Sequence, residues 1–244
     1  MKMIVANWKM QIGRGASVAL AKAVAATKSN ASVVLCPSFT ALDAVGRALS
    51  KSNVALGAQD VFWQLVGAYT GEISPLHLGE LGVAYVIVGH SERRALGETD
   101  AEVNKKVITA LSAGLTPIIC VGESAVERRA GKTRQVLVRQ VKAALKTLHT
   151  RAQERLVFTY EPIWAIGSGR PARPVEAIEA HQLIRQTAML SIKGIRAKQI
   201  MVLYGGSVEA KNTDKFLQQT EVDGLLVGGA SLNAASLKAI IKLC

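Results

Sequence analysis

The feature that most constrains the fold is an eightfold recurrence of short apolar runs along the 244-residue chain. Each run is rich in β-branched residues and nearly continuous in apolar character, which is typical of parallel strands covered on both faces. Between the runs lie segments such as SVALAKAVAATK, AEVNKKVITALSAG and ASLKAIIK, whose apolar spacing of three and four predicts helices. The runs occupy residues 3–7, 32–37, 53–59, 84–90, 116–123, 155–162, 200–206 and 222–229.

Eight strand–helix units predict a closed (β/α)₈ barrel, the TIM barrel, because an open doubly wound sheet usually needs only five or six strands. Barrels of this kind routinely form one domain at this length. An apolar fraction of 49% with 20% charged residues supplies a large core and gives no sign of disorder. No linker, low-complexity tract or change of composition marks a boundary, so we predict one domain over residues 1–244.

The chain is strongly basic, with 30 lysines and arginines against 18 acidic residues and a formal charge of +12. Such an excess attracts anions in general: nucleic acid, an acidic membrane face or a small phosphorylated metabolite. The basic residues are scattered and aromatic residues make up only 5%, which argues against an arginine-rich arm or a base-stacking platform. Charge alone does not choose among these partners, and our expectation of a small anionic partner, with no nucleic acid and no membrane, rests on the motifs described below.

Cysteine usage and the amino-terminal sequence indicate the compartment. Cys36, Cys120 and Cys244 lack C-x-x-C spacing and suggest neither a disulfide framework nor a zinc site. The apolar part of MKMIVANWKM is too short for a signal peptide, and no run of eighteen apolar residues occurs. We expect a soluble, unprocessed protein of the reducing cytoplasm.

Polar residues gather where the predicted strands end, which is where (β/α)₈ barrels place their active sites. Taken singly, each has a simpler explanation: a solvated lysine, a histidine bonded to backbone, a paired carboxylate or an ordinary glycine turn. Their shared position at one end of one barrel favours a functional site. These residues are Asn7, Lys9, Gln59, His90, Glu92 and Glu161, together with the glycine pairs Gly205-Gly206 and Gly228-Gly229.

The residue types in this cluster indicate acid–base chemistry on a phosphorylated substrate. Glu161 precedes the apolar sequence Pro-Ile-Trp, and we expect desolvation there to raise its basicity toward that of a general base. An imidazole can donate to a carbonyl and shuttle protons, and a lysine ammonium can offset charge on oxygen. Backbone amides of the last two glycine-rich turns, with a helix start near Ser231, would form a phosphate cradle. Together these groups predict proton abstraction next to a carbonyl.

Seven short motifs occur in the order, and nearly the spacing, of a known enzyme family. They are ANWKM at 6–10, GAYTGEIS at 67–74, VGHSERR at 88–94, CVGE at 120–123, YEPIWAIGSG at 160–169, YGGSV at 204–208 and GLLVGGASL at 224–232. With these motifs the chain resembles the triosephosphate isomerases over essentially its whole length. Any one of them would be suggestive, and all seven together are very specific.

The resemblance implies an isomerase that interconverts dihydroxyacetone phosphate and D-glyceraldehyde 3-phosphate through an enediolate in glycolysis and gluconeogenesis. This family is a standard example of a tuned catalytic site and of a closing loop. By resemblance, Glu161 is the base, neutral His90 an electrophile and Lys9 a cation near the substrate oxygens. Asn7 lines the same pocket, and Glu92 steadies Lys9. No metal and no organic cofactor is implied.

The resemblance also implies a phosphate site, a mobile loop and a homodimer. A mobile loop over residues 165–172 would close over the phosphate, and Thr70 would reach into the active site of the partner subunit. The backbones implied in phosphate binding are those of Gly167, Ser207, Gly228 and Gly229.

The chain departs from the family pattern in two loops of its first half. The family usually follows NWKM with Asn or His and then Gly, whereas this chain has Gln11 and Ile12. Between Arg94 and Glu98 only the residues 95–97 intervene, one fewer than in the common form. The packing of that loop and any interface role of Glu98 are therefore open.

Another departure has a direct physical consequence. Ser168 and Arg170 replace the usual Thr and Lys conservatively, but Pro171 stands at the carboxyl hinge of the moving loop. Proline fixes φ and removes an amide donor. We therefore expect closure to be faster or less complete than in relatives.

Two alternative functions compete with this interpretation. GSGRPA at 167–172 matches a dinucleotide-binding pattern, but its turn does not follow the strand directly and residues 181–208 contain no acidic residue to hold a ribose. The other alternative is a non-catalytic basic barrel that binds nucleic acid or protein, which the charge of +12 motivates.

Overall fold

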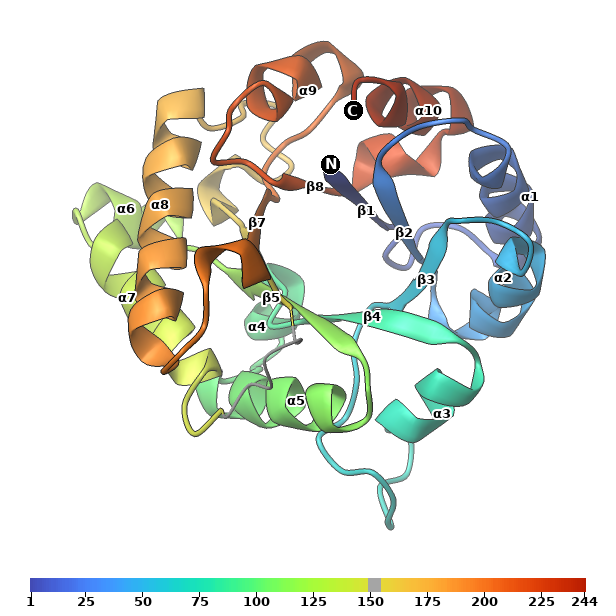
Figure 1. Cartoon of the computed structure of the whole chain (residues 1–244), viewed down its shortest axis with the longest axis horizontal. Helices are drawn as coiled ribbons and strands as arrows, with labels where there is room; N and C mark the ends of the chain where they lie inside the picture. The colour runs from blue at the N-terminus through green and yellow to red at the C-terminus, as the bar shows by residue number, and fades with distance from the viewer. Residues whose placement is uncertain (149–154) are drawn as a thin grey trace.

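All eight predicted apolar runs form strands in the computed structural model, which describes residues 1–148 and 155–244 (Figure 1). The strands are parallel and pair in sequence order, and the eighth pairs with the first to close the barrel. The predicted (β/α)₈ barrel is thereby confirmed. The strands are β1 (Met3–Asn7), β2 (Ser32–Cys36), β3 (Ala55–Ala58), β4 (Val83–Val88), β5 (Thr116–Val121), β6 (Leu156–Tyr160), β7 (Ile200–Tyr204) and β8 (Gly224–Val227).

Helices surround the barrel, as Figure 1 shows, and cover its outer face. Within the described residues they are α1 (Arg14–Ala25), α2 (Leu42–Leu49), α3 (Pro75–Glu80), α4 (Ser91–Ala95), α5 (Asp100–Ser112), α6 (Ala125–Arg129), α7 (Thr133–Ala144), α8 (Pro174–Ser191), α9 (Ala210–Leu217) and α10 (Ala234–Lys242). No helix in this part of the chain is both long and apolar enough to span a membrane.

Local sequence explains where several helices begin. At α5 the Thr99 hydroxyl accepts from the Glu102 N–H at 3.2 Å, and the Glu102 carboxylate accepts from the Thr99 N–H at 2.7 Å. Ser124 and Glu127 form the same reciprocal pair at α6. Each cap satisfies amides that the first helical turn leaves unbonded and contributes about 1 kcal/mol.

Two apolar layers form the core, one inside the barrel and one between the barrel and the helices. Along β1, Met3 and Val5 belong to the inner layer, while Ile4 and Ala6 face the helices. Side chains alternate between the two faces of a strand, so Asn7 continues the inward series at the mouth of the barrel. On β6 the inward Val157 begins the series that ends at Glu161. The two-residue period therefore directs both polar side chains into the mouth.

All strands except β1 end one or two residues before the apolar runs do, and the difference places most of the polar residues in loops. β3 stops at Ala58 and β4 at Val88, so Gln59 and His90 lie beyond the sheet. The segment between β3 and α3 is long and projects away from the barrel in Figure 1.

Candidate active site

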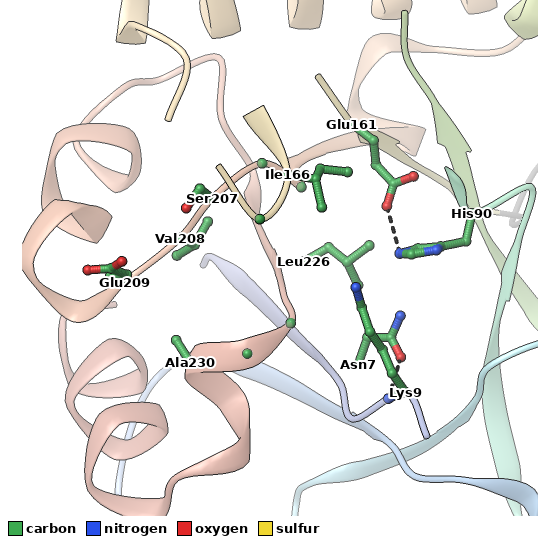
Figure 2. Close-up of a pocket in the computed structure, with 15 residues that line it drawn as sticks. Asn7, Lys9, His90, Glu161, Ile166, Ser207, Val208, Glu209, Leu226 and Ala230 are labelled. Carbon is green, nitrogen blue, oxygen red and sulfur yellow. Dashed lines mark hydrogen bonds and ion pairs between the residues drawn. The ribbon is translucent and has the colours of Figure 1, made fainter. Parts of the chain in front are cut away.

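A cavity of about 360 Å³ opens at the carboxyl end of the barrel. Figure 2 shows its lining, with Glu161 and His90 pointing toward each other. A volume of this size lies at the lower end of the range for small-molecule sites and therefore suits a small ligand. The lining residues are Asn7, Lys9, His90, Glu161, Ile166, Gly167, Gly205, Gly206, Ser207, Val208, Glu209, Leu226, Gly228, Gly229 and Ala230.

Lys9 reaches the cavity from the turn that follows β1. Its backbone N–H donates to Asn7 Oδ1 at 3.0 Å, and its ammonium forms an ion pair with Glu92 Oε1 at 2.6 Å. A Cβ built on Gly228 would lie 3.8 Å from Lys9 Nζ, so the ammonium lies over that glycine. A cation therefore stands between the acid–base pair and the glycine-rich turn after β8.

Glu161 and His90 form a buried pair, with His90 Nε2 and Glu161 Oε1 3.0 Å apart. The second carboxylate oxygen, Oε2, accepts from the backbone N–H of Ser91 at 2.9 Å. His90 precedes the short helix α4, and its Nδ1 accepts from the Glu92 N–H at 3.2 Å. Because Nδ1 is an acceptor, the ring is neutral when its proton is on Nε2, from which it donates to Glu161.

The pKa of Glu161 differs from the expectation drawn from the sequence. Burial does act to raise it, as expected, but the His90 ring and the N–H of Ser91 outweigh burial and hold the pKa below its ordinary value. Their hydrogen bonds stabilise the charged carboxylate. The expectation of raised basicity was wrong for this position of the side chain, because the two donors come from a different loop.

The Glu161–His90 pair shifts the pKa of the imidazole in the opposite direction, upward. Burial acts to lower the pKa of His90, but the charge of Glu161 overcomes it and the net shift is upward. The shift depends on the carboxylate staying beside the ring. If Glu161 moved away, burial and the Glu92 N–H would both favour the neutral imidazole.

Close backbone approach explains two glycines beside Glu161. A Cβ on Gly122 would lie 1.7 Å from the Glu161 carbonyl oxygen, and one on Gly205 would lie 3.1 Å from Glu161 Cγ. No side chain fits at Gly122 without moving the backbone of Glu161, the residue that follows β6. These glycines let the neighbouring strands approach the carboxylate from both sides.

The four residues predicted to bind phosphate, Gly167, Ser207, Gly228 and Gly229, all belong to the cavity lining. The helix start expected near Ser231 is a short 3₁₀ helix, Gly229–Leu232, in which the Ser231 N–H donates to Gly228 O at 2.8 Å. Among the described residues, the N–H of Gly229 at the start of this turn donates to no loop or turn carbonyl.

The remaining predicted residues lie outside the cavity lining. Glu92 pairs with the ammonium of Lys9, and the Gln59 side chain donates to the Lys9 carbonyl. Thr70 is exposed on the projecting segment between β3 and α3. Sequence reasoning did not single out four lining residues, Val208, Glu209, Leu226 and Ala230, and it included Ile166 only as part of the loop 165–172. Leu226 lies two positions before Gly228, so counting the two-residue strand period would have found it.

Nothing in the described ranges, 1–148 and 155–244, gathers three or more His, Cys, Asp or Glu side chains as a metal ion would require. The groups at the mouth are instead a carboxylate, an imidazole and an ammonium beside glycine-rich backbone. They define a class: (β/α)₈ barrels with an acid–base site next to a cradle for a small anion.

Comparison with known proteins identifies the family. The family model described as triosephosphate isomerase matches residues 2–244. The triosephosphate isomerase of Moorella thermoacetica is 47% identical over 98% of this chain and 97% of its own length. That of Thermoanaerobacter pseudethanolicus is 45% identical over 98% of both chains, and that of Pelobacter propionicus is 44% identical over 98% and 97%. The chain belongs to the triosephosphate isomerase family.

The protein is accordingly an isomerase that acts on a phosphorylated triose, interconverting dihydroxyacetone phosphate and D-glyceraldehyde 3-phosphate. This activity belongs to glycolysis. The dinucleotide-binding alternative is wrong, and residues 167–172 instead follow a 3₁₀ turn, Ile163–Ala165, in the loop after β6. The alternative of a barrel without catalytic function is wrong as well.

Proposed function

We propose that Glu161 is the base that moves a proton between the two carbons of the triose, with His90 and Lys9 as its electrophilic partners. The observation that carries this proposal is the buried Glu161–His90 pair, 3.0 Å apart at the mouth of a cavity that also holds Lys9. Base and imidazole are close enough to exchange roles around one small substrate.

In the position described, Glu161 is held as a weak base by His90 and Ser91. For proton transfer it must leave these two donors and turn toward the substrate. Burial then remains without the opposing hydrogen bonds, and the pKa of the carboxyl rises. The apolar side chains of Ile166 and Leu226 line the same cavity and would exclude water around it. We infer that this movement converts a stable carboxylate into an effective base.

The departure of Glu161 also prepares His90. Its Nε2–H becomes free to donate to a substrate oxygen, while Nδ1 stays bound to the Glu92 N–H. Neutral imidazole is the form that such a donor requires here, because an imidazolium would have a second proton on Nδ1 facing another N–H. His90 can then stabilise charge on the enediolate and pass protons between its oxygens.

Lys9 supplies the positive charge for the developing oxyanion; its backbone N–H is bonded to Asn7 and its ammonium is paired with the exposed carboxylate of Glu92. Charge stabilisation of this kind is strong where water is excluded. Backbone amides of Gly167, Ser207, Gly228 and Gly229 would bind the phosphate, with residues 165–172 closing over it. None of these steps draws on a metal or an organic cofactor.

The test is a coupled isomerase assay of the wild type beside Glu161→Gln, with Glu179→Gln as the control. Glu179 is an exposed glutamate on α8, so its variant makes the same chemical change away from the cavity. Glu161→Gln should lose roughly 10³-fold or more in kcat, as expected on removing a positioned base. Equal activity of both variants would refute the assignment.

We also propose that the protein is a homodimer whose interface includes the projecting segment. Three apolar side chains on loops at the carboxyl end of the barrel are strongly exposed: Met10 by 96%, Val66 by 74% and Leu96 by 79%. Large apolar groups on protruding loops are costly to leave in water and mark an interaction surface. A second copy of the chain is the partner that the family resemblance implies, with Thr70 reaching its active site.

Analytical ultracentrifugation of Thr70→Arg tests the dimer. The added charge should convert the dimer to monomers and reduce activity with it, because a buried unpaired charge is strongly unfavourable at an interface. Thr220→Arg, at an exposed threonine in the turn before β8, is the control and should remain dimeric. A monomeric wild type with full activity would contradict the proposal.

Residues 1–244 are proposed to form one domain in the cytoplasm, in keeping with the closed barrel and with three cysteines that form no disulfide. A single cooperative unfolding transition and cytoplasmic fractionation would support these two points. Two separate transitions, or recovery outside the cytoplasm, would contradict them.

A further inference from the structure

Lys9 adopts a backbone conformation that side chains disfavour. Its φ is +50°, and Thr147 is the other non-glycine residue with a positive φ in the part of the chain that the structure describes. Left-handed backbone places Cβ too close to the carbonyl oxygen. Such strain persists only where the surroundings hold it in place, and it concentrates at functional sites. Lys9 therefore needs a restraint.

The restraint comes from both ends of the residue. The Lys9 N–H donates to Asn7 Oδ1 at 3.0 Å, and the Lys9 carbonyl accepts from Gln59 Nε2 at 2.9 Å. The same Gln59 nitrogen donates to the carbonyl of Cys36, the last residue of β2, at 3.0 Å. The side-chain amide of Gln59, which follows β3, thus joins the turn after β1 to the end of β2.

Gln59 is itself well anchored. The next residue, Asp60, is bound by Lys106 Nζ at 2.6 Å and by Arg93 Nε at 3.0 Å. Lys106 is buried in α5, so the segment carrying Gln59 is tied to the helical layer. The amide therefore has a fixed origin from which to hold Lys9.

By contrast, the ion pair at the ammonium end of Lys9 does little to fix where the ammonium lies. Glu92, which binds the ammonium, is exposed on α4, and exposed ion pairs contribute little. The stem between backbone and ammonium is four carbons long and flexible. The backbone conformation therefore decides whether the ammonium stays over Gly228.

We propose that Gln59 is a positioning residue for the isomerisation: it holds Lys9 in its left-handed conformation and so keeps the ammonium at the substrate. The inference rests on the proposed role of Lys9. Without the Gln59 amide, Lys9 relaxes toward ordinary backbone angles and its Nζ leaves the cavity. Gln59 contacts no substrate and acts only through Lys9.

The test is a double-mutant cycle of Gln59→Met and Lys9→Ala, followed by kcat/KM. Methionine keeps the length of glutamine but donates nothing. Asn104→Leu is the matched control, since the Asn104 amide likewise donates to two backbone carbonyls, of Ala144 and Lys146, both at 2.9 Å. That control removes an equivalent bridge far from the cavity, so a merely structural contribution would appear in both variants.

We expect Lys9→Ala to lower kcat/KM by roughly 10²-fold or more and Gln59→Met by about 10-fold to 100-fold. In the Lys9→Ala background, adding Gln59→Met should then change kcat/KM by less than about 2-fold, because residues that act as one unit are not additive. Asn104→Leu should keep wild-type kcat/KM.

Three results would overturn the inference, and they are distinguishable. Full activity of Gln59→Met contradicts it directly, and an equal loss in the Lys9→Ala background shows that Gln59 acts independently of Lys9. Full activity of Lys9→Ala removes the proposed role of Lys9 itself. If Gln59→Met does not fold, Gln59→Asn replaces it in the same cycle, because its amide is one methylene too short to reach both carbonyls.

Discussion

Loss of stability in acid should depend strongly on one buried histidine, His181 of α8. Its ring is fully buried against Tyr160, and the ring atom Nδ1 lies 3.2 Å from the Glu221 carbonyl. The other ring nitrogen, Nε2, has no hydrogen-bond partner. Protonation would therefore place a charge and an unpaired N–H in the core. We predict that His181→Asn makes folding less sensitive to acid, since an amide can still donate to Glu221 but does not titrate.

The magnitude follows from the pKa. Burial lowers the pKa of His181 from 6.5 to about 4, and Arg185 acts in the same direction, against the smaller opposing effects of Glu221 and Asp223. Because the pKa of His181 is lower in the folded protein than in the unfolded chain, stability is unaffected above about pH 6.5, where the ring is neutral in both. As pH falls, the unfolded chain binds a proton that the folded chain excludes. Between about pH 7.5 and about pH 5 this linkage removes about 2 kcal/mol.

Urea unfolding at both pH values, for wild type and His181→Asn at one fixed protein concentration, measures the effect. The wild type should lose about 2 kcal/mol more than the variant across this interval. Carboxylates with lowered pKa, such as Glu102 and Glu176, contribute equally to both proteins and cancel in the difference. Parallel loss of stability in the two proteins would refute the reasoning.

Three further predictions concern the loop, the charge and the thiols. Pro171→Thr restores an amide next to Ala172, whose N–H donates to the Tyr204 hydroxyl at 2.9 Å. It should change turnover and the rate of loop exchange measured by NMR relaxation, and no change in either would contradict the proposed effect of proline. The charge of +12 should steer the dianionic substrate, so kcat/KM should fall as ionic strength rises, and a flat profile would count against steering. Burial raises the pKa of Cys36 and of Cys120, so a thiol reagent should modify at most Cys244 in the native protein and all three thiols after unfolding; rapid native modification of Cys120 would disprove this.

The fold was open to prediction because its signal is local and repeated. A run such as Leu156–Tyr160 is apolar on both faces, and that pattern indicates a covered parallel strand before any contact is known. Eight such runs leave few alternatives to a closed barrel. The strand ends were less well defined, since β3 covers only Ala55–Ala58 of the run 53–59. Pairing with neighbouring strands, which the sequence does not display, decides where a strand stops.

The candidate site likewise has features that could be predicted from the sequence and features that only the structure shows. Glu161, His90 and Lys9 could be chosen from sequence because polar groups at the ends of barrel strands must meet at one mouth. The sequence did not reveal that Ser91 and His90 would hold Glu161 as a weak base, or that Gln59 would bind the backbone of Lys9. These contacts join residues as far apart in the sequence as His90 and Glu161.

The sequence by itself therefore determined the barrel, the family and the residues gathered at its mouth, because hydrophobic period and motif order are properties of the chain. Only the tertiary structure decided the pKa of Glu161, the tautomer of His90 and the strained backbone of Lys9. Each of these depends on hydrogen bonds and burial supplied by other loops. The free energies of these hydrogen bonds and of this burial exist only in the folded protein.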